Sequence, residues 1–216
     1  YTDALPICVL ILCPLSIMHS AWLSDLNNSI IHRSAIVAHH PKASRRIEMI
    51  QQDYEFVICN YDGLNLIADE VIADGRFDLV IVDEANAYKT VTTKRWKTLK
   101  SIIGPQTHLW MMTGTPASQS PVDAYGLAKL VNPDNVPKFF TSWRDQVMNK
   151  VTMFKWAAKP TAPALVQPVV CCRESPHCRR GNCVTGAIPR PRHGAHHPDH
   201  QHLPARGLAV WLPRGD

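Results

Sequence analysis

The chain has 216 residues, of which 45% are hydrophobic and 19% are charged, and its formal net charge is +5. This composition excludes an intrinsically disordered chain and is typical of a globular domain with one real core. Residues 160–216 contain seven arginines and three acids, whereas residues 1–159 contain 16 basic and 15 acidic residues. The basic excess belongs to the C-terminal tail, so charge alone does not predict phosphate binding by the N-terminal part.

The apolar stretch Leu5–Leu15 is the first feature along the chain. It contains Pro6 and Pro14, has no basic region before it and is too short to cross a bilayer. A buried parallel strand over Ile7–Cys13 is the better interpretation, because strands covered on both faces have nearly continuous apolar runs. We therefore expect no membrane partner and a cytoplasmic location.

Short apolar runs and amphipathic segments then alternate. Further strands are predicted at Ser34–His39, Glu55–Cys59, Phe77–Val82 and His108–Met112. Helices are predicted at Ile17–Leu26, Ala43–Gln52, Leu64–Ala73, Thr92–Ile103 and Pro121–Val131, with a turn at Asn60–Gly63 and a C-cap at Gly75. The alternation predicts an α/β fold with a mostly parallel sheet and helices on both faces. In such sheets the ligand site lies at the carboxyl ends of the strands.

Two acidic residues, Asp83 and Glu84, follow the apolar segment Leu79–Val82 directly. Carboxylates at the end of a buried strand are costly unless something uses them. In nucleotide hydrolases one carboxylate holds Mg²⁺, usually through water, and the next can orient or deprotonate the attacking water. The alternative is a turn with two solvated acids.

Three more polar segments follow predicted strands. Cys13-Pro14-Leu15-Ser16 leads from the first strand into a helix that contains Trp22, and Asn60-Tyr61-Asp62 ends the third strand. Thr113-Gly114-Thr115-Pro116 follows the fifth strand and places two hydroxyls beside a sharply bending backbone. That geometry suits sensing of a phosphate site, although alone it is also a simple strand-to-helix turn.

In this order the four segments resemble motifs Ia, Ib, II and III of the Swi/Snf-type ATPases of helicase superfamily two, especially the phage and prophage members. The stretch Asp123-Ala124-Tyr125-Gly126-Leu127 resembles the family's continuation after motif III. The similarity covers roughly residues 5–157. It implies a partial RecA-like P-loop NTPase domain, the first motor lobe of a DNA translocase or helicase, with ATP and Mg²⁺ as cofactors and duplex DNA as partner.

The resemblance also implies residue roles. Asp83 would coordinate the Mg²⁺ of MgATP, and Glu84 would activate the water. The residues implied in hydrolysis and its coupling to lobe movement are Asp83, Glu84, Asn86, Thr113, Gly114 and Thr115. The residues implied to lie near the nucleic-acid track are Ser16, Asn60, Tyr61 and Asp62. Lys89 matches a basic position after motif II, and a solvated surface lysine explains it equally well.

Two departures from the family concern the site itself. Asn86 stands where motif II usually has histidine, but asparagine can still donate and accept hydrogen bonds. The 216 residues contain no Gly-x-x-x-x-Gly-Lys-Ser/Thr segment, the Walker A loop that cradles phosphates. In the family this loop lies upstream of the strand at Ile7–Cys13, and the second RecA-like lobe is also missing from this chain. We therefore expect the polypeptide alone to hydrolyse ATP negligibly.

The tail, residues 158–216, changes character. From residue 160 it has nine prolines, six histidines and no Lys, Phe, Tyr or Met. We predict that it is disordered, or an out-of-frame translation that begins near Pro168–Cys172. A zinc site is an alternative, although the spacing of its candidate ligands fits poorly. Those ligands are Cys171, Cys172, His177, Cys178 and Cys183. A basic arm that touches nucleic acid is a further option.

Three functions stay open at this point. The first is a fragment of an ATP-dependent DNA translocase. The second is another P-loop hydrolase, of the restriction or DEAD-box type, although a DEAD-box protein would have Ser-Ala-Thr at motif III. The third is a non-catalytic nucleic-acid-binding module with a degenerate NTPase fold.

Overall fold

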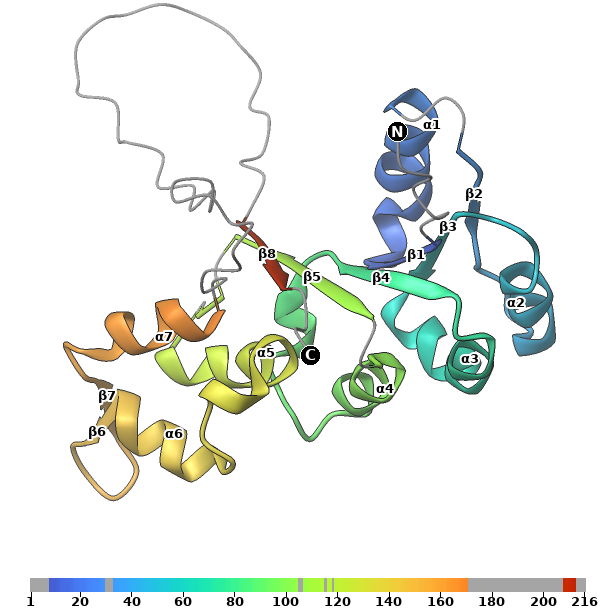
Figure 1. The fold of residues 1–216 in the computed structure, drawn as a ribbon. Helices are drawn as coiled ribbons and strands as arrows, with labels where there is room; N and C mark the ends of the chain where they lie inside the picture. The colour runs from blue at the N-terminus through green and yellow to red at the C-terminus, as the bar shows by residue number, and fades with distance from the viewer. Residues whose placement is uncertain are drawn as a thin grey trace, which may run out of the picture.

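A computed structural model describes residues 8–29, 33–104, 107–114, 116–117, 119–170 and 208–212 (Figure 1). Its centre is a parallel sheet with the strand order β2-β3-β1-β4-β5. The strands are β1 (Cys8–Cys13), β2 (Ala35–Val37), β3 (Phe56–Asn60), β4 (Phe77–Val82) and β5 (His108–Thr113). A strand from the tail, β8 (Leu208–Leu212), pairs antiparallel with the outer edge of β5. The predicted α/β fold with a mostly parallel sheet is confirmed.

The helices fill the connections as the sequence pattern predicts. Short helical turns η1 (Leu15–Ile17) and η2 (Met18–Leu23) lead into α1 (Ser24–Ser29), and the later segments are α2 (Ala43–Ile50), α3 (Tyr61–Asp74), η3 (Ala85–Tyr88) and α4 (Lys94–Ile102). After β5 come η4 (Pro121–Asp123), α5 (Ala124–Val131), η5 (Pro133–Asn135), α6 (Phe140–Val147), β6 (Met148–Lys150), β7 (Trp156–Ala158) and α7 (Ala162–Val170). None of the helices in the described ranges is long and apolar enough to cross a membrane.

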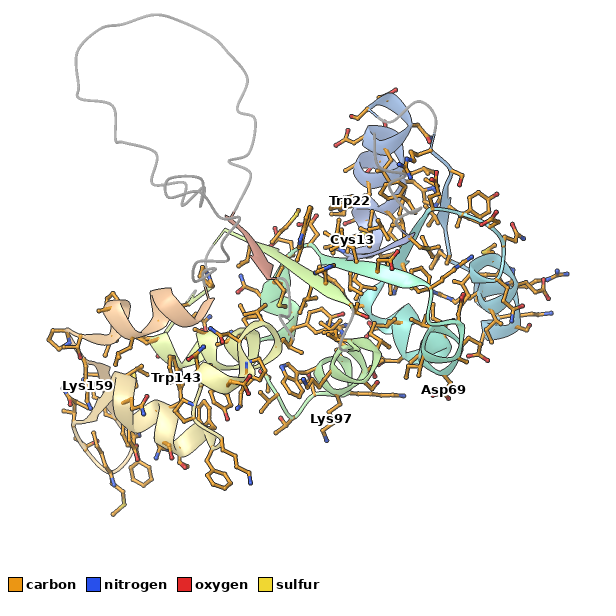
Figure 2. The ribbon with its side chains drawn as sticks, viewed as in Figure 1. Cys13, Trp22, Asp69, Lys97, Trp143 and Lys159 are labelled. Atoms are coloured by element: carbon orange, nitrogen blue, oxygen red, sulfur yellow. The ribbon has the colours of Figure 1, made fainter. Side chains whose placement is uncertain are left out.

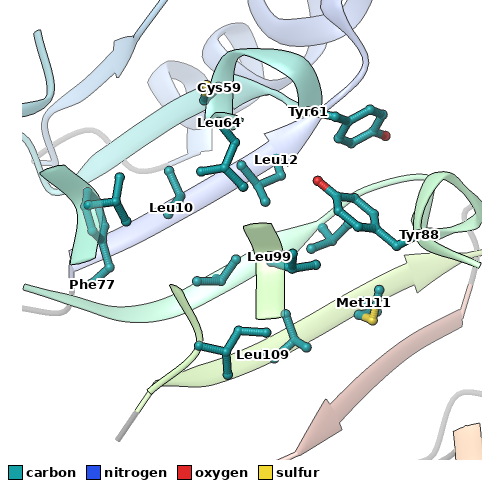
Figure 3. Packing of buried hydrophobic residues seen from close by; sticks show 14 of the residues in the cluster. Leu10, Leu12, Cys59, Tyr61, Leu64, Phe77, Tyr88, Leu99, Leu109 and Met111 are labelled. Carbon is teal, nitrogen blue, oxygen red and sulfur yellow. The ribbon is translucent and has the colours of Figure 1, made fainter. Parts of the chain in front are cut away.

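Successive residues of β1 point to opposite faces of the sheet, and both faces are covered. Leu10 and Leu12 are fully buried in a cluster with residues of α2, α3, α4 and α5 (Figure 3). Ile11 and Cys13 are fully buried on the other face, against η2 and α1. Burying one such aliphatic side chain stabilises a fold by roughly 1.5–3 kcal/mol. This layering confirms the expected helices on both faces.

The turn predicted at Asn60–Gly63 is wrong, because helix α3 begins at Tyr61. Tyr61, Leu64 and later residues of the helix are buried at helical spacing, so the apolar stripe starts one turn earlier than predicted. A methyl group at Gly63 would overlap the Arg46 guanidinium, so this glycine provides space rather than a turn. Gly75, with φ +64°, ends the helix in the left-handed conformation, and the predicted C-cap is confirmed.

A second core lies beyond β5 and extends past residue 157. It joins Ala124 and Tyr125 of α5 to Trp143 of α6 and to Ala162 and Val166 of α7, all of them buried. The packed structure therefore includes the first part of the segment predicted as tail. Residues 171–207, which contain the candidate zinc ligands, lie outside the described residues.

Candidate active site

The chain reverses its direction of travel across the sheet between β1 and β4. From β1 it passes to β2 and then β3 on one side, and it continues to β4 and β5 on the other. Ligands in open parallel sheets bind at the carboxyl ends of strands where such a reversal occurs. The ends that meet at this point are Cys13 of β1 and Val82 of β4, and the Asp83 N–H donates to the Leu12 carbonyl oxygen (2.8 Å). The predicted acidic pair thus lies at the reversal.

Asp83 is bound by residues from two other motif segments. The Trp22 indole Nε1–H donates to Asp83 Oδ2 (2.9 Å), and the Tyr61 hydroxyl donates to the Asp83 carbonyl oxygen (2.6 Å). Asp83 Oδ1 accepts the backbone N–H of Glu84 (2.9 Å). Both carboxylate oxygens are therefore oriented before any ligand arrives, a preorganisation that favours a fixed metal position.

Trp22 reaches this carboxylate from η2, a π-helical segment that follows β1 after the short turn η1. Figure 2 labels Trp22 and Cys13 close together at the base of this helical segment. Single π-helical turns occur frequently at functional sites because the wider turn redirects side chains. The helix predicted at Ile17–Leu26 is confirmed, although its first part is π-helical rather than α-helical. This π-helical part positions the Trp22 indole.

Glu84 has a left-handed backbone, with φ 47° and ψ 55°. It is the one non-glycine residue with positive φ in the described part of the chain. This conformation costs about 1–3 kcal/mol and persists where the surroundings determine it, often at functional sites. The Asp83 carboxylate holds the Glu84 N–H, and the Glu84 carbonyl accepts from Ala87 N–H (3.1 Å). The twist leaves the Glu84 side chain exposed, where it can meet a water molecule.

Motif III lies beside motif II. Turn η3 packs against β5, whose last residue, Thr113, is 4% exposed. Asn86 of η3 has a buried Oδ1 atom with no hydrogen-bond partner among the described residues. Buried acceptors are normally hydrogen-bonded, so this oxygen is available to a donor that comes close to η3 and β5. Gly114 is exposed, and Thr115 lies outside the described residues.

The segments predicted near nucleic acid lie on the same edge of the sheet. Ser16 is exposed just after β1. Asn60 ends β3, and its Oδ1 accepts from Arg46 Nη1 (3.1 Å). Because the oxygen is engaged, the amide can offer its two N–H donors to a partner. Asp62 is exposed at the start of α3. Tyr61 differs from the other three: it is only 9% exposed, and its hydroxyl donates to the Asp83 carbonyl oxygen.

Two arginines support this edge. Arg46 is 6% exposed and also donates to the carbonyl oxygens of His40 (2.6 Å) and Ala38 (3.3 Å). Arg95 of α4 binds both carboxylate oxygens of Asp62 at 2.7 Å. These hydrogen bonds hold the pKa of the Asp62 carboxyl below its usual value. The carboxylate therefore stays ionised and is neutralised by the guanidinium, which reduces the negative charge at this edge.

The sequence alone predicted no role for Trp22, Arg46 or Arg95. Trp22 was part of the quoted motif, but its target lies 61 residues away. Arg46 could have been suspected, because it shares the buried face of α2 with Ile50 at an i, i+4 spacing. No sequence signal connects Arg95 to Asp62.

Lys89 is not a free surface lysine. Its Nζ lies 3.6 Å from Asp123 Oδ2, which links motif II to the start of α5. A methyl group at Gly126 would overlap the Lys89 carbonyl group, so α5 approaches the backbone after motif II very closely. The Gly126 carbonyl oxygen accepts from Trp96 Nε1–H (2.8 Å). The two helices α4 and α5 are thereby joined beneath η3.

The donor set at Asp83 fits Mg²⁺. This ion keeps several waters and is usually bound by one or two carboxylates together with substrate phosphates, so a cluster of three or more protein ligands is not needed. No such cluster occurs in the described ranges. The 216 residues contain no Walker A segment, the loop that cradles nucleotide phosphates in P-loop NTPases.

Comparison with known proteins decides the family. A family model described as the SNF2-related domain matches residues 6–173. The chain belongs to the SNF2-related domain family. A Caenorhabditis elegans relative is named SWI/SNF-related matrix-associated actin-dependent regulator of chromatin subfamily A-like protein 1 homolog. It is 25% identical over 139 residues, which cover 63% of this chain and 19% of the relative.

A solved structure is similar as well. It is titled Sulfolobus solfataricus SWI2/SNF2 ATPase core in complex with dsDNA. The similarity has a TM-score of 0.53 at 22% sequence identity and covers 64% of this chain and 27% of that chain. The SNF2-related chain thus has the RecA-like fold of an ATPase core, and it spans only about a fifth to a quarter of these longer proteins.

Proposed function

We propose that this chain is part of the first motor lobe of an ATP-dependent DNA translocase and that it supplies the metal and water side of the hydrolysis site. The observation that carries the proposal is the convergence of two other motif segments on Asp83, the first residue of the acidic pair. Trp22 binds its carboxylate, Tyr61 binds its carbonyl oxygen and Glu84 follows it in a left-handed conformation. Family membership supports the same conclusion.

In this proposal Asp83 would hold Mg²⁺ through its oriented carboxylate, and the ion, when bound, would supply positive charge beside the nucleotide phosphates. Glu84 orients the attacking water and takes its proton, a role that typically contributes 10²–10⁴-fold in rate. Asn86 and the Thr113 turn pass the state of the site to the rest of the motor.

Duplex DNA is the proposed partner of the edge formed by Ser16, Asn60 and Asp62. The solved relative is titled as a complex with dsDNA, which supports this choice. The Asn60 amide can offer donors, and Arg95 neutralises Asp62, so the edge suits contact with phosphates. Tyr61 lies between Asn60 and Asp62 in the sequence and also binds Asp83. It therefore connects the proposed DNA edge directly to the proposed metal ligand.

In the same proposal, hydrolysis by these 216 residues alone is negligible, because they contain no Walker A segment. We also propose that the protein acts in the cytoplasm and resembles the phage and prophage branch of the family. The competing proposal is a non-catalytic nucleic-acid-binding module, which the missing phosphate loop favours.

The test uses a protein in which these 216 residues are joined to a phosphate loop and a second RecA-like lobe. Glu84→Gln should lower DNA-stimulated ATP hydrolysis by at least about 100-fold, with nucleotide binding retained. Asp69→Asn, which changes an exposed carboxylate of α3, is the matched control and should hydrolyse normally. Equal hydrolysis by the Glu84→Gln variant would remove Glu84 from its role. A wild-type protein that binds DNA without hydrolysing ATP would support the non-catalytic module.

A further inference from the structure

The near-zero net charge of residues 1–159 hides an uneven distribution. Residues 1–137 contain 11 basic and 14 acidic residues, whereas residues 138–159 contain five basic residues and one acid. This basic segment consists of α6 and the β6–β7 hairpin. Its single acid, Asp145, lies 3.4 Å from Arg144 of the same helix. A local net charge of +4 therefore belongs to one small structural unit outside the motif residues.

The backbone at the tip of the β6–β7 hairpin is held by hydrogen bonds, yet the side chains of the tip project into solvent. The Val151 N–H donates to the Lys155 carbonyl oxygen (2.8 Å), and Thr152 Oγ1 accepts from the Lys155 N–H (3.0 Å). Met153 is nevertheless 75% exposed and Phe154 is 91% exposed. A large aromatic side chain exposed to this degree on a hydrogen-bonded tip has no role in the packing of the described chain. Contiguous exposed apolar groups of this kind indicate an interaction site.

The hairpin is firmly attached to the rest of the lobe. The Arg144 guanidinium lies over the Trp156 ring (4.1 Å), and the Lys159 N–H donates to the Val147 carbonyl oxygen (2.9 Å). Helix α6 also packs against η4, in the segment that follows the carboxyl end of β5. Figure 1 shows α6 with β6 and β7 as a unit beside α5 and α7. The hairpin is thus part of the segment that follows β5, the strand that ends at motif III.

We propose that the β6–β7 hairpin is a second contact for duplex DNA. Lys150 and Lys155 face phosphates, and Met153 and Phe154 form an apolar wedge against a groove. Charge complementarity carries the choice of partner, because neither lysine has an ion-pair partner among the described residues. Proteins that hold duplex DNA often combine basic side chains with inserted Phe or Met. The inference rests on the proposed DNA-binding function and extends it to a surface outside the motifs.

The experiment measures binding of a fluorescent DNA duplex by the full 216-residue chain over a range of salt concentrations. The Lys150→Gln/Lys155→Gln variant should make the slope of log K against log[salt] shallower by about 1.8, since each phosphate contact contributes about 0.9. The Met153→Ser/Phe154→Ser variant should weaken binding by about tenfold with an unchanged slope, because apolar insertion releases no counterions.

Matched controls lie on helices away from the hairpin. Lys94→Gln/Lys97→Gln removes two exposed lysines of α4, and Leu66→Ser/Ile72→Ser removes two exposed apolar side chains of α3. Both controls should bind as the wild type does. The changed positions are all solvent-facing, and circular dichroism of each variant checks that the fold is retained.

The outcomes separate this inference from the proposed function. If the wild type binds duplex DNA and both hairpin variants match it in affinity and slope, the hairpin contact is refuted and the proposed function stands. If polyglutamate displaces the duplex as well as unlabelled DNA does, the hairpin is a general acidic-polymer surface and the proposal also fails. If the wild type binds no duplex even at low salt, the proposed function and the hairpin contact fail together.

Discussion

The bond between Trp22 and Asp83 gives the sharpest test of the site. A hydrogen bond to a charged acceptor contributes about 1.5–3 kcal/mol. Asp83 is only half-buried, so water can replace part of the lost bond. We expect a coupling energy of about 1–2 kcal/mol between Trp22→Phe and Asp83→Ala in a double-mutant cycle. The free energy of unfolding of each variant, from urea denaturation of the chain, provides the four corners of the cycle.

Trp96→Phe is the matched control for this cycle. It also removes an indole hydrogen bond, but its acceptor is the Gly126 carbonyl oxygen rather than Asp83. Its effect and that of Asp83→Ala should therefore add within about 0.5 kcal/mol. A Trp22–Asp83 coupling as small as that of the control would refute the reasoning, because the indole would then not hold the carboxylate.

Two further predictions concern the elements beneath the site. Gly126→Ala should destabilise the chain by about 1–3 kcal/mol in urea, because the new methyl group would overlap the Lys89 carbonyl group and outweigh the helix-forming gain of alanine; an unchanged midpoint would contradict this close approach. The pair of Asp62 and Arg95 is exposed, so its coupling should be only about 0.2–1 kcal/mol. Arg95 lowers the pKa of Asp62 in the folded chain, so the stabilisation by this pair should be present above the unfolded-state pKa and disappear as pH falls through the folded-state pKa. An Asp62→Asn variant whose free energy of unfolding depends on pH as that of the wild type does would argue against the pair.

The strand segments and the position of the site followed from the sequence because both depend on local patterns. Apolar runs such as Phe77–Val82 are long enough to predict buried strands, and polar residues directly after them must lie at the carboxyl edge. The family motifs then placed Asp83 and Glu84 at that edge, and the structure agrees. The roles of these residues remain proposals.

The supporting contacts could not be predicted, because they join residues that only the fold brings together. Arg46 meets Asn60 through the space left by Gly63, a glycine that by itself suggests a turn. The left-handed backbone at Glu84 could not be predicted, because glutamate is not a residue type that favours positive φ. The near-zero net charge of residues 1–159 gave no sign of a basic surface, because it averages the basic segment of α6 and the hairpin with the more acidic residues before it.

The pairing of β5 with β8 has a consequence for assembly. The two strands align antiparallel from Leu109 opposite Leu212 to Thr113 opposite Leu208. Such ladders depend on main-chain N–H and C=O groups, so many different sequences can form them. A segment from the compositionally unusual tail can therefore complete the sheet without resembling the family. By the same reasoning β8 is exchangeable: β5 is a pairing template, and another extended segment can take the place of its present partner.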